Sequence, residues 1–206
     1  IAWVVGDIDT SDYGMILYTD DGGVSWERQG AGENVFKDVS VTDLYILDKN
    51  KVWVVCDDYR VARTNDAGNT WEEVNCPPGN PMGGLTCISI VENTNVWISG
   101  DYGYVASSTD DGNSWTVYDT AIFNSILCQG VCAINSQIVY IVANDGSKNE
   151  TGLIRRTLDG GNTWEEVELD DDFDAKCAWI GVTATDANHV VVYSGLGYYA
   201  YTVNGG

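Results

Sequence analysis

The sequence is poor in positive charge, in proline and in long apolar runs. Its 206 residues include 10 Lys and Arg against 31 Asp and Glu, which gives a formal net charge of −21. So acidic a surface repels nucleic acid phosphates and anionic lipids, and no nucleic acid partner is expected. No apolar run approaches the ~20 residues of a membrane-spanning helix, so no membrane insertion is expected. With 3 prolines but 23 glycines, the composition suits many tight turns and excludes a proline-rich linker.

Motifs that bind metals or cofactors are missing as well. The single histidine is His189, and although the chain has six cysteines, it contains no C-x-x-C pair. Structural zinc sites are usually built from paired Cys and His. Calcium loops of the common type need regularly spaced Asp and Asn and a closing Glu, a pattern that does not occur here. We therefore expect no metal and no cofactor.

The cysteines allow disulfides without determining which pairs form. Cys76 and Cys87 flank an insertion rich in Pro and Gly, and a disulfide between them would staple it. Cys128 with Cys132, or either of them with Cys177, is an alternative. Disulfides persist mainly in oxidising compartments, so a pairing of this kind predicts an extracellular protein or one at a cell or virion surface.

An eight-residue segment recurs along the chain. It reads Ser/Thr-x-Asp-x-Gly-x-Ser/Thr-Trp, and a shortened fifth copy begins at Thr202. The four full copies are Thr19–Trp26, Thr64–Trp71, Ser108–Trp115 and Thr157–Trp164. They start about 45 residues apart, which is the period of a four-stranded propeller blade. Because one turn has been repeated, the unit around it is expected to repeat too.

Stretches rich in β-branched and aromatic residues surround each copy. An almost wholly apolar stretch precedes it, such as Val52–Cys56 or Val96–Gly100, and is expected to be a strand buried on both faces. A second strand leads into the segment and a third begins at its Trp. A fourth, such as Val39–Asp43 or Val131–Asn135, precedes the next apolar strand, and its small and medium residues suit the inner position of a radial array.

Four strands in each unit, without a convincing amphipathic helix, predict an all-β fold. The expected architecture is a β-propeller of four-stranded antiparallel blades. The units of this single propeller region are approximately 1–43, 44–92, 93–135, 136–186 and a partial 187–206. The first unit lacks an innermost strand and the last lacks an outermost one. About four and a half repeats are thus expected, as part of a larger or incompletely covered propeller.

The recurrent segment resembles the Asp-box, also called the bacterial neuraminidase repeat. The wider unit, best seen at Gly152–Trp164, is most similar to the photosystem II assembly and stability factor family. Sialidases, sortilin-type receptor ectodomains and xyloglucan-active glycoside hydrolases share the box on propellers. The resemblance therefore implies a fold and does not imply one activity.

The composition of the box favours a structural role. An Asp in a tight turn accepts hydrogen bonds from backbone amides, the Gly permits positive φ, and the Trp buries a large ring. Five copies cannot all be one active site, so the box residues are expected to be scaffold. They are Asp21, Gly23, Trp26, Asp66, Gly68, Trp71, Asp110, Gly112, Trp115, Asp159, Gly161 and Trp164.

No catalytic residues can be assigned. A sialidase-like site needs an arginine triad, which the five arginines do not suggest, and glycoside hydrolysis in general needs two facing carboxylates. Arg63 and Arg156 share one repeat position, just before the box hydroxyl. In the assembly-factor family surface arginines contribute to partner binding, so the resemblance implies such a role for these two. The alternative is that they are cations that solubilise the surface.

A non-enzymatic binding or assembly module is therefore the expected function. It would present loops to a protein or a glycan outside the cytoplasm, and other subunits of a larger assembly are further candidate partners. Aromatic residues such as Tyr102, Tyr104, Tyr198 and Tyr199 could contact such a partner, or could pack between blades. The alternative function is a sialidase-like or xyloglucanase-like glycoside hydrolase that acts on glycans.

Overall fold

Eighteen strands form five antiparallel sheets in the computed structural model, which describes residues 1–75, 78, 83–118, 127–144, 152–169 and 178–205. The first sheet holds β1 (Ala2–Ile8), β2 (Gly14–Thr19) and β3 (Glu27–Gln29). The second holds β4 (Val41–Ile46), β5 (Val52–Cys56), β6 (Val61–Thr64) and β7 (Glu72–Glu73). The third holds β8 (Leu85–Val91), β9 (Asn95–Gly100), β10 (Val105–Ser108) and β11 (Thr116–Val117). The fourth holds β12 (Leu127–Ala133), β13 (Val139–Asn144), β14 (Gly152–Thr157) and β15 (Glu165–Glu166). The fifth holds β16 (Trp179–Ala184), β17 (Val190–Ser194) and β18 (Tyr199–Thr202).

Helical structure in the described residues is confined to two short 3₁₀ turns, η1 (Asn34–Phe36) and η2 (Asp101–Gly103). Neither turn is long or apolar enough to cross a membrane. Within every sheet, strands that are neighbours in space are consecutive in sequence. Each sheet after the first takes its inner strand from the end of the preceding sequence unit, so the sheets are offset from the units by one strand.

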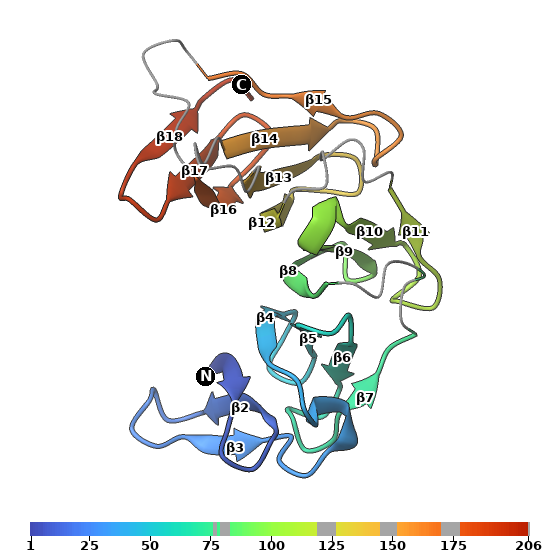
Figure 1. Cartoon of the computed structure of the whole chain (residues 1–206), viewed down its shortest axis with the longest axis vertical. Helices are drawn as coiled ribbons and strands as arrows, with labels where there is room; N and C mark the ends of the chain where they lie inside the picture. The colour runs from blue at the N-terminus through green and yellow to red at the C-terminus, as the bar shows by residue number, and fades with distance from the viewer. Residues whose placement is uncertain (76–77, 79–82, 119–126, 145–151, 170–177, 206) are drawn as a thin grey trace.

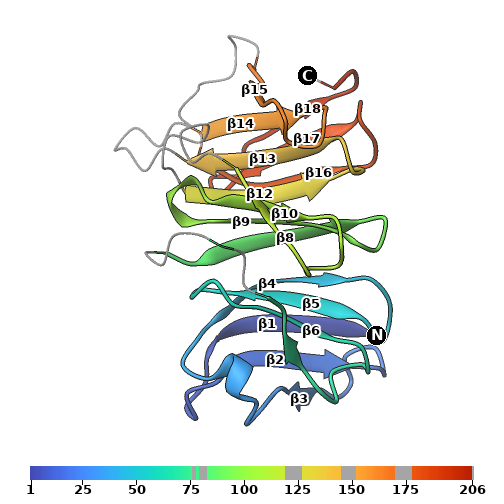
Figure 2. The same cartoon turned by 90° about the vertical axis from the view of Figure 1, so that its right-hand side faces the viewer.

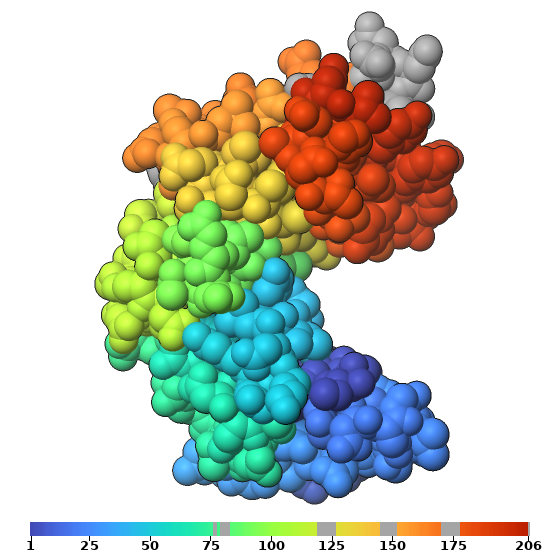
Figure 3. Space-filling model, turned by 180° about the vertical axis from the view of Figure 1, so that it is seen from behind, coloured from blue at the N-terminus to red at the C-terminus, as the bar shows by residue number. Residues whose placement is uncertain are grey.

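The five sheets follow one another around a common centre (Figure 1). Their inner strands β4, β8, β12 and β16 contact each other in that order, and β1 contacts β4. Seen from the side, the sheets stack face to face (Figure 2). Figure 3 shows the resulting arc, with the first and fifth sheets at its ends and an opening between them. This radial arrangement of short antiparallel sheets confirms the predicted all-β propeller fold.

Burial of the apolar strands, β1, β5, β9, β13 and β17, depends on where their sheet lies in the arc. In the middle sheets β5 and β9 are buried at every residue, and β13 at all but its last, as the continuous apolar runs predict. In the end sheets the prediction of burial on both faces is wrong. There β1 and β17 contain exposed apolar residues such as Val4 and Tyr193, because only one face of each end sheet is covered by a neighbour.

Four separate apolar clusters hold the sheets together, one at each junction between neighbours. The first junction, for example, joins Trp3 and Ile16 of the first sheet to Val52 and Val54 of the second. The second, third and fourth junctions have clusters of the same kind. The arc therefore has no single shared core, and each sheet is stabilised by the sheets beside it.

The inner strands carry a bulge near their start, at the second or third residue of the strand. The ladder shifts register at Thr42, Thr86, Gln129 and Ile180. At the first two of these bulges a threonine hydroxyl reaches the next sheet. Thr42 donates to the Leu85 carbonyl at 2.8 Å, and Thr86 donates to the Cys128 carbonyl. Each of these two bulges therefore turns a side chain of one inner strand towards the backbone of the next.

Candidate functional site

The box turns are closed by their own side chains. In the fourth copy, Asp159 Oδ1 accepts hydrogen bonds from the Thr163 amide at 2.8 Å and the Thr157 hydroxyl at 2.9 Å. Asp159 Oδ2 accepts the Thr163 hydroxyl at 2.7 Å, and the Gly161 amide donates to Thr157 Oγ1 at 2.7 Å. The first, second and third copies repeat these contacts. The carboxylates are therefore used by the turn itself.

These hydrogen bonds favour the ionised carboxylates. The hydroxyl and amide of Ser114, with the hydroxyl of Ser108, lower the pKa of Asp110 to about 2. Donors from Ser25 lower the pKa of Asp21 in the same way, and donors from Thr70 lower that of Asp66. A carboxylate that stays ionised and is surrounded by turn donors is a poor general acid, so the geometry supports the predicted scaffold role.

The low pKa of the box aspartates predicts a loss of stability in acid. A carboxyl group whose pKa is lower in the folded than in the unfolded protein stabilises the fold above the unfolded value of 3.8, and this stabilisation is lost as the pH falls towards about 2. We expect the melting temperature to fall between about pH 5 and pH 2.5. The matched variant is Asp110→Asn, which cannot titrate at that position. Its melting temperature should fall less than that of the wild type over the same range, and equal slopes would contradict the assignment.

Each box after the first also docks onto the sheet before it. A Cβ atom added to Gly68 would lie 2.6 Å from Trp3 Cη2, and one added to Gly112 would lie 3.0 Å from Trp53 Cη2. Trp71 packs edge to face on Trp3, with ring centroids 6.0 Å apart. The first box has no preceding sheet in the arc, and Trp26 is 42% exposed. The box is thus a joint between sheets as well as a turn.

Arg63 and Arg156, which share a repeat position, lie at junctions of the same kind, between one sheet and the box of the next. Arg63 lies 5.2 Å over the Trp53 ring and pairs with Glu72 at 2.6 Å and with Asp111, a residue of the next box, at 2.8 Å. Lys51 also pairs with Asp111 at 2.8 Å.

Arg156 pairs with Glu165 at 2.5 Å and donates to the carbonyl of Gly205 in the fifth box. Both guanidinium groups are engaged inside the molecule, where each clamps the box of the following sheet. The sequence shows that Arg63 and Arg156 share a repeat position, but it does not show which residue lies opposite them. A role in binding a partner stays a prediction.

The four cysteines that the structure describes have free thiols, whereas the sequence predicted a disulfide. Cys87 has a free thiol that donates to the Gln129 carbonyl at 3.0 Å, while Cys76 lies outside the described residues. Cys56, Cys128 and Cys132 are also free. Burial raises the pKa of the Cys56 and Cys87 thiols to about 12, so they are poorly reactive at neutral pH. The structure gives the Cys76–Cys87 pair no support, and the compartment inferred from it stays a prediction.

Alkylation can test the state of Cys87 directly. We expect iodoacetamide to modify Cys87 slowly in the native protein at neutral pH, since its thiolate is disfavoured by burial. After unfolding without reductant, Cys87 should be modified fully, as judged by mass spectrometry of its peptide. If alkylation instead requires prior reduction, the disulfide predicted from the sequence exists.

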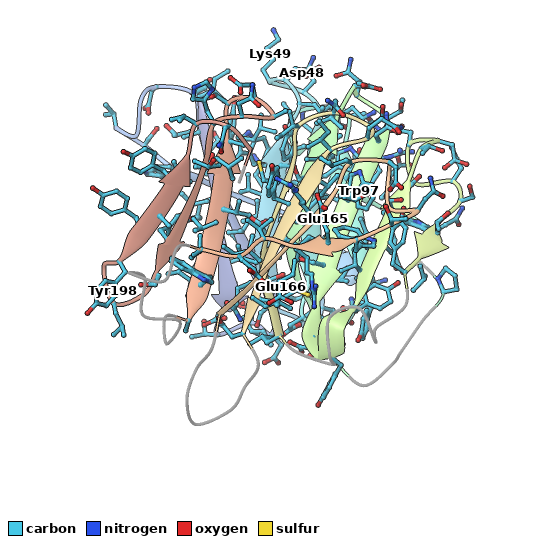
Figure 4. All side chains as sticks on the ribbon, turned by 90° about the horizontal axis from the view of Figure 1, so that it is seen from above. Asp48, Lys49, Trp97, Glu165, Glu166 and Tyr198 are labelled. Carbon is cyan, nitrogen blue, oxygen red and sulfur yellow. The ribbon has the colours of Figure 1, made fainter. Side chains whose placement is uncertain are left out.

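The aromatic residues singled out in the sequence divide into two groups. Tyr104 is buried and packs against Tyr59, with ring centroids 5.3 Å apart, so it is part of a junction. Tyr102, Tyr198 and Tyr199 are exposed. Figure 4 shows Tyr198 projecting from the end of the fifth sheet, whereas Asp48 and Lys49 mark the opposite rim.

A cavity of about 550 Å³ lies between the fourth and fifth sheets. Its apolar lining includes Tyr140 and Ile154 of the fourth sheet, Val167 directly after β15, and Val192 and Ala200 of the fifth sheet. Among the described residues that line the cavity, Glu168 is the only acidic one. These residues thus lack the facing carboxylate pair of glycoside hydrolysis, and the described part of the chain holds no cluster of metal-binding side chains.

Comparison with solved structures agrees with this geometry. The chain is similar to YCF48 bound to a D1 peptide, with a TM-score of 0.50 and 16% identity over 99% of this chain and 74% of that one. It is similar to an ancestral GH74 enzyme, with a TM-score of 0.66 and 14% identity over 98% of this chain and 32% of that one. It is also similar to NanB, with a TM-score of 0.58 and 11% identity over 92% of this chain and 35% of that one.

At these identities the likeness shows the fold alone, which is that of the β-propellers. The chain spans about a third of the GH74 and NanB chains, and about three quarters of the YCF48 chain. No protein-family model matches the sequence, and no curated protein matches it.

Proposed function

We propose that the chain is a non-enzymatic propeller module that binds an extended segment of a partner protein at its fifth sheet. The observation that carries the proposal is a tyrosine face, which we define as Tyr193, Tyr199 and Tyr201 together with Ile180 and Val191. Tyr199 is 63% exposed and Tyr201 is 69% exposed. Alternate residues of β17 and β18 point to the same side, so these side chains form one surface.

Tyrosine suits such a surface because its ring gives a large contact area and its hydroxyl gives a hydrogen bond. The box carboxylates close their own turns, and Arg63 and Arg156 clamp neighbouring boxes, so these groups are used within the molecule. A protein of the same fold, YCF48, has been seen with a D1 peptide. The resemblance to the assembly-factor family supports the same class of function.

Peptide and glycan arrays probed with the chain would test the proposal. We expect peptides to be retained, and the double variant Tyr199→Ser with Tyr201→Ser to bind them at least about tenfold more weakly. The matched control is Tyr102→Ser, which removes an exposed tyrosine from the third sheet and should leave binding unchanged. Loss of binding in the control but not in the double variant would contradict the assignment of the face.

Glycoside hydrolysis is the second candidate, and the likeness to the GH74 enzyme is the observation that favours it. Incubation of the chain with xyloglucan and with a sialylated oligosaccharide should yield no product under the proposed function. Turnover of either substrate would establish the enzyme instead.

A further inference from the structure

Asp43 is a carboxyl group that joins two inner strands in the middle of the arc. Its strand β4, in the second sheet, contacts β8 of the third sheet, and the two strands are neighbours in Figure 2. Asp43 Oδ2 accepts a hydrogen bond from the amide of Ile88 on β8 at 2.9 Å, and Oδ1 accepts one from the amide of Leu44 at 2.8 Å. One carboxyl group therefore holds an amide of its own strand and an amide of the next sheet.

The next junction has contacts of the same kind without a carboxylate. There the Ser89 hydroxyl oxygen on β8 accepts the amide of Ala133 on β12 at 3.0 Å. The position equivalent to Asp43 is Cys87, because each of these residues directly follows the bulge of its strand. The Cys87 thiol donates to the Gln129 carbonyl. A hydroxyl and a thiol thus make in the third junction the contacts that a carboxylate makes in the second.

The charge of Asp43 is not balanced by an ion pair. None of the ion pairs formed by the described residues includes Asp43. The side chain is partly buried, and the loss of solvation raises its pKa above the ordinary value of 3.8, against the smaller opposing effects of the Ile88 and Leu44 amides. In the folded protein Asp43 therefore takes up a proton at a higher pH than it does in the unfolded chain.

The titratable groups that face Asp43 are neutral in a neutral solution. Burial, helped by the charge of Asp43, raises the pKa of the Cys87 thiol to about 12. Burial also raises the pKa of Tyr45 on β4 and of Cys132 on β12. The other titratable groups on strands packed against β4 lie in the first junction or in solvent, and they are Cys56 of β5, Tyr18 of β2 and Asp7 of β1. Among the described groups that face this junction from the inner strands, Asp43 is therefore the one that gains a proton as the pH falls from neutral.

We propose that Asp43 is a proton-sensitive clasp between the second and third sheets. An ionised carboxylate accepts both amides, whereas an oxygen that gains a proton becomes a donor and accepts less strongly. The Leu44 amide stays beside the carboxyl group because it belongs to the next residue. The Ile88 amide is held across the space between two sheets, so it is the amide that is released. Acidification thus loosens the inner strands of this junction while the apolar cluster of the same junction still packs.

The direction of the pKa shift separates this event from the titration of the box aspartates. The pKa of Asp43 lies above 3.8 in the folded protein, whereas that of Asp110 is about 2. Because its folded pKa is raised, the stability that Asp43 contributes is fully present below the unfolded pKa and is lost as the pH rises through the folded pKa. The box aspartates have the opposite dependence. Protonation of Asp43 does not itself unfold the protein, so the clasp opens within the folded state.

Amide hydrogen exchange followed by NMR tests the clasp in the 206-residue chain. Between about pH 7 and about pH 4, the protection of the Ile88 amide should fall at least about tenfold relative to that of Ala133, after correction for the intrinsic effect of pH on exchange. Ala133 is the matched control, because its amide is held across the next junction by a serine hydroxyl that does not titrate. The midpoint of the change should coincide with the titration of the Asp43 carboxyl carbon.

The variant Asp43→Asn keeps an acceptor oxygen but cannot take up a proton. In this variant the ratio of the Ile88 and Ala133 protection factors should stay constant over the same pH range. A melting curve shows whether the variant is folded, and the comparison of the two amides in the wild type tests the proposal even if it is not. Equal pH dependence of the two amides in the wild type would overturn the proposal. A change at Ile88 that persists in the folded variant would overturn it too, and neither result bears on binding at the fifth sheet.

Discussion

Replacing Gly112 with alanine should lower the free energy of unfolding by about 2–5 kcal/mol, from the sum of two unfavourable terms. Gly112 has a φ of +81°, a region that costs an alanine about 1–2 kcal/mol. The added Cβ would also overlap the Val74 side chain and lie 3.0 Å from Trp53, which is fully buried. Overpacking of this kind costs about 1–3 kcal/mol. Denaturant unfolding followed by tryptophan fluorescence measures the change.

Gly23 is the matched control for this substitution. It occupies the same box position with a φ of +88°, but a Cβ there would approach only the ring of Trp26, at 3.7 Å. Gly23→Ala should therefore carry the backbone cost alone, about 1–2 kcal/mol. If the two variants are equally destabilised, the box glycine is needed for its turn and the inferred contact with the preceding sheet contributes nothing.

Replacing Trp71 with alanine should cost about 3–5 kcal/mol, the range for removing a large aromatic side chain from a packed interior. Trp71 is only 7% exposed and packs edge to face on Phe36, with ring centroids 5.3 Å apart, and on Trp3. Its loss would leave a cavity at the junction between the first and second sheets. The same denaturant experiment applies, with circular dichroism to confirm that the sheets persist.

Trp26 provides the comparison, because it is the tryptophan of the first box. It is 42% exposed, and Trp26→Ala should cost about 1 kcal/mol or less. A large effect for Trp26 would show that the ring stabilises its own turn. A small effect for Trp71 would show that the junction tolerates the missing ring.

The sequence predicted the parts of this fold that local physics determines. The box is a turn whose hydroxyl, Asp and Gly satisfy one another within eight residues, so each full copy was sufficient to locate the strand before it and the strand after it. The apolar strands were visible because β-branched residues formed continuous runs. The outer strands begin one residue after the box Trp, close to where the pattern placed them.

The contacts between neighbouring sheets could not be predicted from the sequence pattern. All four complete boxes have the same sequence pattern, yet Trp71 is buried and Trp26 is not, because only one of them has a sheet in front of it. The sequence shows that Arg63 shares its repeat position with Arg156, but it does not show that Arg63 pairs with Asp111, which lies 48 residues further along the chain. Such a contact depends on how one blade sits on the next, which the period alone does not reveal.

The inner strands were the least accurate part of the prediction. The expected Val39–Asp43 is observed as β4 at Val41–Ile46, and the expected Val131–Asn135 as β12 at Leu127–Ala133. Each of these strands contains a bulge, at Thr42 and Gln129, which interrupts the alternation that periodicity relies on.

The separation of the four apolar clusters has a consequence for how the protein unfolds. Among the described residues each junction between neighbouring sheets has an apolar cluster of its own. Because the four clusters are separate, one junction can open while the packing of the others persists. The strands that are buried on both faces, β5, β9 and β13, should therefore open last, which hydrogen exchange of their amides would measure.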